Sequence, residues 1–337
     1  MSSYKKEIGT AVQNFAGDPA NPLTGQLWYD SDASEFKYQE QVTGNAWSTG
    51  NSMNTARSQL AGAGTQTAAL GFGGTTPPVS ALTEQYNGTS WTEVADLNTA
   101  RRLIAGTGTQ TSSLAFGGHA PSVTAATESW NGSSWTEVAD LNTARVALAA
   151  AGADNTSALA FGGLNPPTFY ANTESWNGSS WTEVNDLNTA RRDLGGNGII
   201  TSALAYGGDT PGATAATESW NGTSWTDVAD LNTARRLAGA GTDNTNALGI
   251  GGETPGGASA LTESWNGSIW TETSDLNTAR QELGATGASN SSALAFGGSL
   301  NPPAVAFTEE WNAGINLGAW VTGGSMNTAR QNLGGAG

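Results

Sequence analysis

The tetrapeptide Asn-Thr-Ala-Arg occurs seven times in this chain of 337 residues and constrains its fold more than any other feature. Successive copies begin 44 to 50 residues apart, from Asn54 to Asn327. A period of this length indicates one supersecondary unit that is used repeatedly and that buries its faces against its neighbours. The repeat therefore predicts one repetitive architecture, although repeated scaffolds host many functions.

One unit, residues 98–141, reads as four short β-strands. Two strands of small and apolar residues end at the Gly-Gly doublet at 117–118, and an alternating third strand follows a Pro-containing loop. The Asn-Gly dipeptide at 131–132 predicts a tight hairpin because both turn positions need positive φ. Four antiparallel strands in about 44 residues are typical of one β-propeller blade, whereas helical repeats would need long amphipathic runs.

The residues of this unit resemble those of the kelch family of β-propellers. Kelch units have an Arg near the start of the innermost strand, a Gly-Gly doublet, an aromatic residue in the third strand and a Trp in the fourth. Arg101, the doublet at 117–118, Trp130 and Trp135 match this pattern. The resemblance covers about residues 25–337, but the usual third-strand Tyr is kept only at Tyr86.

We predict an all-β fold: a seven-bladed β-propeller of four-stranded antiparallel blades. The fourth-strand Trp occurs seven times, at Trp47, Trp91, Trp135, Trp181, Trp225, Trp270 and Trp320. The Gly-Gly doublet that ends the second strand occurs six times, so the chain begins and ends inside a unit. Residues 25–48 match strands two to four, and residues 327–337 match strand one. Together they should form a closing blade with the C-terminus as its innermost strand, and deleting residues 327–337 should open the ring.

The predicted domains are an N-terminal arm for attachment, residues 1–24, and the propeller, residues 25–337. The arm carries no apolar stretch of signal-peptide length, and no stretch of the chain has 18 consecutive apolar residues. We therefore expect synthesis in a cytoplasm and no membrane insertion.

Composition argues against several functions. The net charge is −16, with only 13 basic residues, so no nucleic-acid partner is expected because phosphate binding needs clustered positive charge. Cys is absent and His119 is the single His, which argues against thiolate metal sites and a Ser-His-Asp triad. We expect no catalytic activity and no cofactor. The residues near Asp209 and Glu253 do not show the spacing of oxygen ligands that would support a calcium site there.

The repeated Arg has two interpretations. A ring of guanidinium groups around one mouth of the channel would bind an anion. Alternatively, each Arg pairs inside its blade with the Asp that precedes the motif or with the third-strand Glu. We favour the structural role, because a residue repeated in all blades serves blade packing better than one asymmetric ligand; the paired Trp rings should likewise fill space between blades. The arginines of this structural repeat are Arg57, Arg101, Arg145, Arg191, Arg235, Arg280 and Arg330.

The loops after the Gly-Gly doublets differ while the strands stay nearly constant. Each loop contains Pro, which stiffens it and lowers the entropic cost of binding. Strand alternation places all of them on one face, together with the Asn-Thr-Ala-Arg connections. The alternative is that they vary without a function. The residues of the candidate binding face are His119, Asn165, Phe169, Tyr170, Leu300 and Phe307.

Two functions remain open. Residues 12–22 and the Gly-Gln-Leu-Trp-Tyr-Asp run at 25–30 resemble segments in structural and tail proteins of bacteriophages, especially marine ones. This resemblance implies a non-catalytic virion or tail-appendage protein. Its arm would bind other virion proteins, and its loops would recognise a host-surface glycan or protein or decorate the particle. The alternative is an intracellular kelch-like adaptor for protein–protein interaction.

Overall fold

The computed structural model describes residues 13–16, 27–32, 35–300 and 302–322. Every regular element within these residues is a β-strand, and none of the described residues forms a helix suited to crossing a membrane. The chain divides into two compact units, Met1–Gly44 with Gly314–Gly337, and Asn45–Ala313. In the first unit, β1 (Gln13–Phe15) runs parallel to β2 (Leu27–Asp30), which pairs antiparallel with the start of β3 (Glu35–Gly50).

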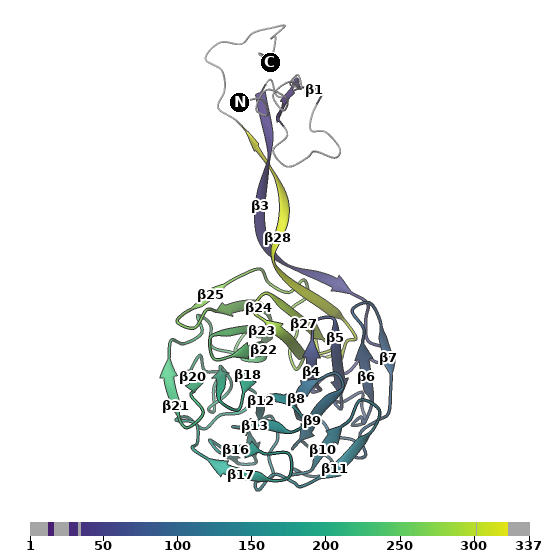
Figure 1. The fold of residues 1–337 in the computed structure, drawn as a ribbon, viewed down its shortest axis with the longest axis vertical. Coiled ribbons are helices and arrows are strands. Elements are labelled where there is room, and N and C mark those ends of the chain that lie inside the picture. Colours follow the sequence, from purple (N-terminus) through teal and green to yellow (C-terminus); the bar gives the residue numbers. More distant parts are fainter. Residues whose placement is uncertain (1–12, 17–26, 33–34, 301, 323–337) are drawn as a thin grey trace, which may run out of the picture. The chain divides into compact units, whose positions relative to one another are not determined.

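The second unit is a β-propeller with six blades among the described residues, so the prediction of seven blades is wrong (Figure 1). Its first five blades are antiparallel sheets of four strands each. Blade one is β4 (Ala61–Thr65), β5 (Ala68–Phe72), β6 (Thr83–Tyr86) and β7 (Trp91–Glu93). Blade two is β8 (Ala105–Thr109), β9 (Ser112–Phe116), β10 (Thr127–Trp130) and β11 (Trp135–Val138). Blade three is β12 (Ala149–Asp154), β13 (Ser157–Phe161), β16 (Thr173–Trp176) and β17 (Trp181–Val184). Blade four is β18 (Gly195–Ile199), β19 (Ser202–Tyr206), β20 (Thr217–Trp220) and β21 (Trp225–Val228). Blade five is β22 (Arg236–Asp243), β23 (Asn246–Thr254), β24 (Gly257–Trp265) and β25 (Trp270–Glu272).

Blade six joins the two ends of the second unit. It contains β26 (Gly284–Ser289), β27 (Ser292–Phe296) and the start of β28 (Thr308–Thr322), and its outermost strand is the end of β3. The ring centroids of Trp47 and Trp311 lie 5.4 Å apart, as the equivalent Trp130 and Trp135 rings do at 5.3 Å in blade two. The Asn277 side-chain amide donates to the Trp47 carbonyl at 3.3 Å. Trp47 is therefore the fourth-strand Trp of blade six and does not mark a blade of its own.

The strands predicted for a seventh blade lie elsewhere. Leu27–Asp30 and the start of β3 pair with each other in the first unit, as does Gln13–Phe15 with Leu27–Asp30. The innermost strand of the last blade is Gly284–Ser289, so ring closure does not require residues 327–337. Those residues, and most of the predicted arm at 1–24, lie outside the described residues.

Six indole groups link neighbouring blades. Each fourth-strand Trp is buried and donates its Nε1–H to a Thr in the third strand of the preceding blade. The distances are 2.9 Å for Trp91 to Thr308, 3.1 Å for Trp135 to Thr83, 3.2 Å for Trp181 to Thr127, 3.0 Å for Trp225 to Thr173, 3.1 Å for Trp270 to Thr217 and 3.1 Å for Trp47 to Thr262. The large rings fill space between blades while their polar atoms remain bonded. The chain of contacts returns to its start after six blades.

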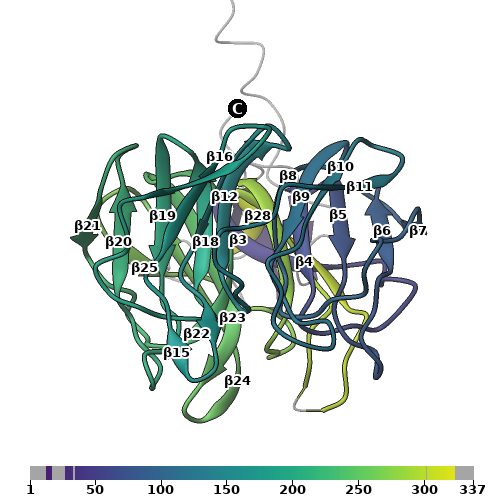
Figure 2. The same ribbon diagram turned by 90° about the horizontal axis from the view of Figure 1, so that it is seen from below.

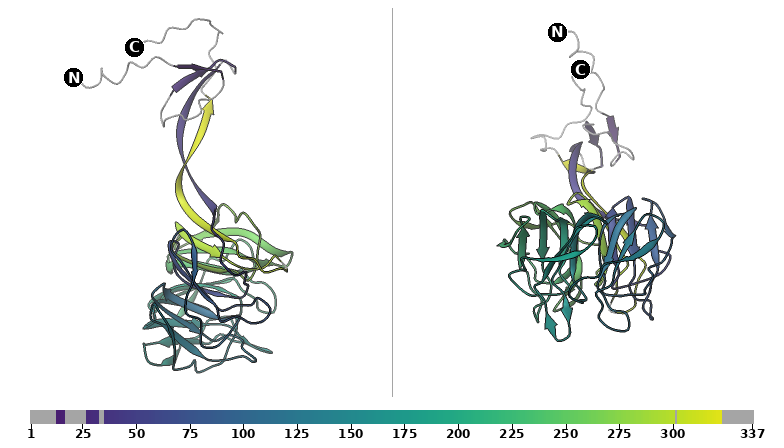
Figure 3. Two further views of the ribbon diagram at one scale, coloured as in Figure 1. Left: turned by 90° about the vertical axis from the view of Figure 1, so that its right-hand side faces the viewer. Right: turned by 60° about the horizontal axis from the view of Figure 1, so that its bottom comes forward.

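The loops between second and third strands share one face of the ring, as strand alternation predicts. In blade three this loop forms a small hairpin of β14 (Leu164–Asn165) and β15 (Thr168–Phe169), and in blade five β23 and β24 continue into a long hairpin. Both protrude in the same direction as the yellow loop of blade six (Figure 2). Figure 3 shows the blades from two further directions. We call this surface the loop face; it comprises residues 75–79, 119–123, 164–170, 209–213, 253–257, 299–300 and 302–307.

Candidate functional site

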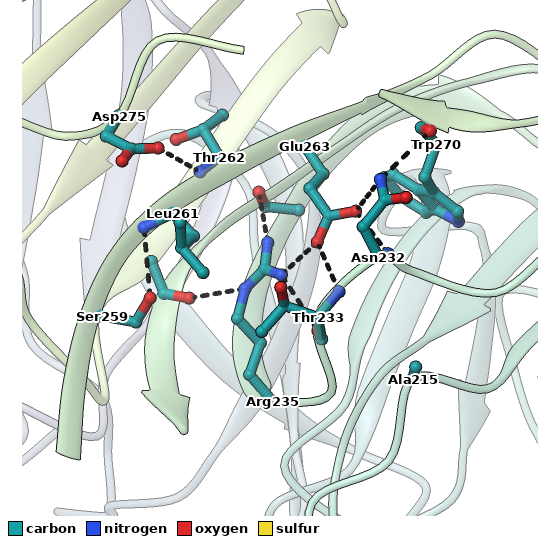
Figure 4. Close-up of polar contacts among 12 residues, drawn as sticks. Ala215, Asn232, Thr233, Arg235, Ser259, Leu261, Thr262, Glu263, Trp270 and Asp275 are labelled. Carbon is teal, nitrogen blue, oxygen red and sulfur yellow. Dashed lines mark hydrogen bonds and ion pairs between the residues drawn. The ribbon is translucent and has the colours of Figure 1, made fainter. Parts of the chain in front are cut away.

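The Asn-Thr-Ala-Arg motif holds a buried Glu from both of its ends, as blade five illustrates (Figure 4). Arg235 is fully buried and forms a very short ion pair with Glu263. Its Nε and Nη2 also donate to the carbonyls of Gly251 and Gly249, both at 3.2 Å. The other Glu263 oxygen accepts from the backbone and side-chain amides of Asn232 at 2.7 and 2.8 Å. The motif thus locks the connection before each blade onto that blade's second and third strands.

The Arg–Glu pair, and the hydrogen bond from the Asn backbone N–H to the same Glu, recur in every described blade. The remaining pairs are Arg57–Glu84 at 2.9 Å, Arg101–Glu128 and Arg145–Glu174 at 2.8 Å, and Arg191–Glu218 and Arg280–Glu309 at 3.1 Å. Burial lowers the pKa of these five guanidiniums, that of Arg280 to about 10, while the paired Glu opposes this shift. These six arginines lie inside the blades rather than at the channel mouth. Arg330 lies outside the described residues.

The Asp that precedes each motif does a different job from the Glu. The Asp96 Oδ1 accepts the backbone N–H of Thr83 at 3.2 Å, and Asp140 and Thr127 repeat this contact at 3.1 Å. Because the carboxylate caps a backbone donor, it joins the fourth-strand end to the third strand. The sequence left the choice between Asp and Glu open, and in the structure the direct partner of each Arg is the Glu.

The candidate residues of the loop face fall into two separate groups. His119 lies in blade two, and Asn165, Phe169 and Tyr170 lie in the adjacent blade three. Leu300 and Phe307 belong to blade six, which stands opposite blade three in a ring of six (Figure 1). The structure therefore does not gather them into one patch.

The blade-three group is partly packed against its own scaffold. Phe169 contacts a small apolar cluster that includes Val146 and Leu164, and the Arg192 guanidinium lies 5.7 Å from the centroid of the Phe169 ring. This distance is within cation–π range. Tyr170 is half-buried and its backbone bonds to Gly163 and Arg191. These residues therefore shape the loop as well as its surface.

The blade-six group is more open. Leu300 is 37% exposed and Phe307 is 40% exposed, and both rank among the large apolar side chains most accessible in the described residues. The Phe307 carbonyl accepts from the buried Arg280 at 2.9 Å, which fixes the backbone beneath the ring. An exposed aromatic on a rigid backbone is suited to contact with a partner.

A series of backbone hydrogen bonds joins the blades around the channel mouth at the loop face. Five residues there have φ between 51° and 57°, in the left-handed region that side chains other than Gly rarely adopt. Four of their N–H groups donate to a carbonyl of the preceding blade: Gln59 to Glu282, Leu103 to Gln59, Ala147 to Leu103 and Asp193 to Ala147, at 2.8 to 3.0 Å. Blade five is one residue shorter here, so Leu237 takes this place and donates to Asp193 at 3.3 Å.

The mouth carries a charged cluster that our sequence analysis missed. Arg192 and Arg236 both bind the Asp209 carboxylate, at 2.9 and 3.2 Å, and Arg236 also binds Glu253 at 2.6 Å. Asp193 stands 3.5 Å from Arg192. The signal available in the sequence was the Arg-Arg doublet at 191–192 and 235–236, whose second member is not part of the structural repeat.

These contacts also bear on a calcium site near Asp209 or Glu253. Both carboxylates are engaged by Arg236. Among the described residues, no group of three or more His, Cys, Asp or Glu side chains is arranged to hold a metal ion.

Comparison with known proteins adds no family to this description. The chain matches no protein-family model, and no curated protein sequence is significantly similar to it. The β-propeller fold is therefore established by the structure itself, while the kelch and phage resemblances rest on the sequence segments given above.

Proposed function

We propose that the protein is a non-catalytic recognition module, part of a phage virion or tail appendage, whose loop face binds a host-surface glycan or protein. The main support for this proposal is that sequence differences between the blades are concentrated in the loops of one face. Six blades repeat the same buried Arg–Glu pairs and the same Trp–Thr contacts. The loop sequences at one face differ in every blade. A rigid scaffold with varied loops is the arrangement on which binding sites are commonly built.

The exposed apolar residues of blade six supply the contact surface for this role. Arg280 holds the backbone at Phe307, so binding through this exposed ring costs little conformational entropy. The resemblance of residues 12–30 to phage structural proteins supports the virion setting, with this segment as the link to other virion proteins.

Cell binding tests the recognition role. Fluorescently labelled protein should adsorb to cells of the host, and the double variant Leu300→Ser/Phe307→Ser should lose at least tenfold in affinity. Ile269→Ser is the matched control: Ile269 is 54% exposed but lies in a hairpin at the opposite ends of the strands. Equal adsorption by both variants would contradict a role for the blade-six loop.

Mass spectrometry of purified phage particles tests the virion setting separately. Peptides of this chain should be present at many copies per particle. Their presence only in host cytoplasm would contradict the virion assignment and favour an intracellular adaptor.

A further inference from the structure

The channel mouth carries side chains that ring closure does not require. The hydrogen bonds between blades need only a backbone N–H on a residue in the left-handed conformation. Gly adopts this conformation at the lowest cost in free energy. The chain instead places Gln59, Leu103, Ala147, Asp193 and Glu282 there. Their chemistry differs from blade to blade, so the mouth is asymmetric although the scaffold beneath it repeats.

These side chains border a cavity of about 210 Å³ with two unlike walls. Leu103 and Ala147, from blades two and three, form an apolar wall. Asp193, Arg236 and Glu282, from blades four to six, form a charged wall. Farther along the channel a second cavity of about 270 Å³ is lined by Gly, Ala, Thr, Asn and Ile, so the charge is confined to the loop-face end.

The charged wall has more negative charge than its cations neutralise. Arg192 and Arg236 direct their closest contacts to Asp209 and Glu253. Asp193 keeps only looser contacts, at 3.5 and 4.0 Å. Glu282 receives a hydrogen bond from the Gln59 amide at 2.8 Å. Among the residues that line the cavity, the three carboxylates of Asp193, Glu253 and Glu282 therefore face one guanidinium, that of Arg236.

Acceptor capacity also remains unused inside this cluster. Asp209 is 2% exposed, and its Oδ2 is directed at both guanidiniums. Its Oδ1 has no hydrogen-bond partner among the described residues. This oxygen does not line the cavity, so Asp209 acts by holding Arg192 and Arg236 in place.

We propose that the channel mouth binds an alkylammonium group, with the ammonium among the carboxylates of Asp193, Glu253 and Glu282 and the alkyl part against Leu103 and Ala147. An ammonium group supplies three hydrogen-bond donors and the missing positive charge. The apolar wall favours an attached hydrocarbon over a bare metal ion. This inference rests on the proposed function, since it names the ligand chemistry at the centre of the loop face.

The ionisation of Asp193 gives the binding a pH dependence. The pKa of Asp193 is raised to about 6. Burial is the main cause, Arg192 and Arg236 oppose it, and Asp209 and Glu282 add to it. The ligand needs the ionised carboxylate. Affinity should therefore fall about tenfold between pH 7.5 and pH 5, where roughly one tenth of Asp193 remains ionised.

Calorimetry with n-butylammonium chloride as the probe tests the inference, with 1-butanol as the neutral analogue. Binding of the cation but not the alcohol is expected. The double variant Asp193→Asn/Glu282→Gln should lose at least tenfold in affinity. The matched control Glu93→Gln/Glu137→Gln makes the same change in charge on exposed outer strands and should change affinity less than twofold. Equal binding of butanol, or undiminished binding by the channel-mouth variant, would overturn the proposal.

Two further ligands distinguish the source of the amine. Nα-acetyl-lysine amide represents a protein partner, and glucosamine represents an amino sugar; preferential binding of either supports the proposal and names its source. If none of the three amines binds while Leu300→Ser/Phe307→Ser still weakens cell adsorption, the channel-mouth inference fails and the proposed function stands. If butylammonium binds but the Leu300→Ser/Phe307→Ser variant adsorbs normally, the channel-mouth inference stands and the proposed role of the blade-six loop fails.

Discussion

The Trp47 indole N–H donates to Thr262 Oγ1 at 3.1 Å, across 215 residues of sequence, and this contact joins blade six to blade five through a strand from the N-terminal side of the ring. The equivalent Trp–Thr hydrogen bond links each of the remaining five pairs of neighbouring blades. Ring closure is thus chemically identical to the internal joints, although it unites distant parts of the chain.

Trp47→Ala should lower the free energy of unfolding by about 3 to 5 kcal/mol, because it leaves a large cavity between two blades. Trp47→Phe retains most of the packing and should cost about 1 to 2 kcal/mol for the lost hydrogen bond and the smaller ring. Urea unfolding followed by tryptophan fluorescence measures both. If Trp47→Ala unfolded at the wild-type midpoint, the closing role of this strand would be wrong.

The buried ion pairs should be intolerant of single substitutions. Arg145→Met leaves the Glu174 carboxylate buried without its cation, which typically costs about 3 to 5 kcal/mol. The double variant Arg145→Met/Glu174→Met should recover part of this loss, because no unpaired charge remains. Thermal unfolding of the three proteins gives the comparison; a double variant less stable than Arg145→Met would contradict this reasoning.

One inter-blade contact is missing and can be restored. The Asn155, Asn244 and Asn290 side chains donate to third-strand Trp carbonyls of the preceding blade at 3.1 to 3.2 Å. Ile200 occupies the equivalent place in blade four and offers no donor to the Trp176 carbonyl.

Ile200→Asn should therefore stabilise the joint between blades three and four by about 0.5 to 1 kcal/mol, reduced by the apolar contact that Ile200 gives up. The reciprocal control, Asn155→Ile, should destabilise by about 1 to 2 kcal/mol. Chemical denaturation midpoints with unchanged slopes would measure these effects, and destabilisation by both substitutions would refute the idea of a missing clamp.

Asp193 should make stability depend on pH. Its folded-state pKa of about 6 exceeds the ordinary value, so its contribution is most favourable at low pH and is lost as pH rises through about 6. Relative to wild type, Asp193→Asn should gain about 1 to 2 kcal/mol between pH 4 and pH 7.5; a quarter of the side chain is exposed, which reduces the full effect. Unfolding at the two pH values checks this, and a constant difference between the proteins would contradict it.

The sequence by itself determined the blade. The strands of residues 98–141, the turn at the Asn-Gly dipeptide and the position of the variable loops all follow from local spacing, because hairpin turns and strand alternation are set by neighbours along the chain. The internal role of Arg101 also followed from repetition, since a carboxylate recurs beside each such Arg.

Only the tertiary structure decided how many blades close the ring. The Trp47 segment and the Trp320 segment look alike in sequence, yet only Trp47 fills the outer place of blade six. Which segment forms the outermost strand of blade six depends on long-range pairing between β3 and β28, and the local sequence does not predict that pairing. The channel mouth is a second example: Asp193 and Asp209 of blade four meet Arg236 only because the ring places blade five beside blade four.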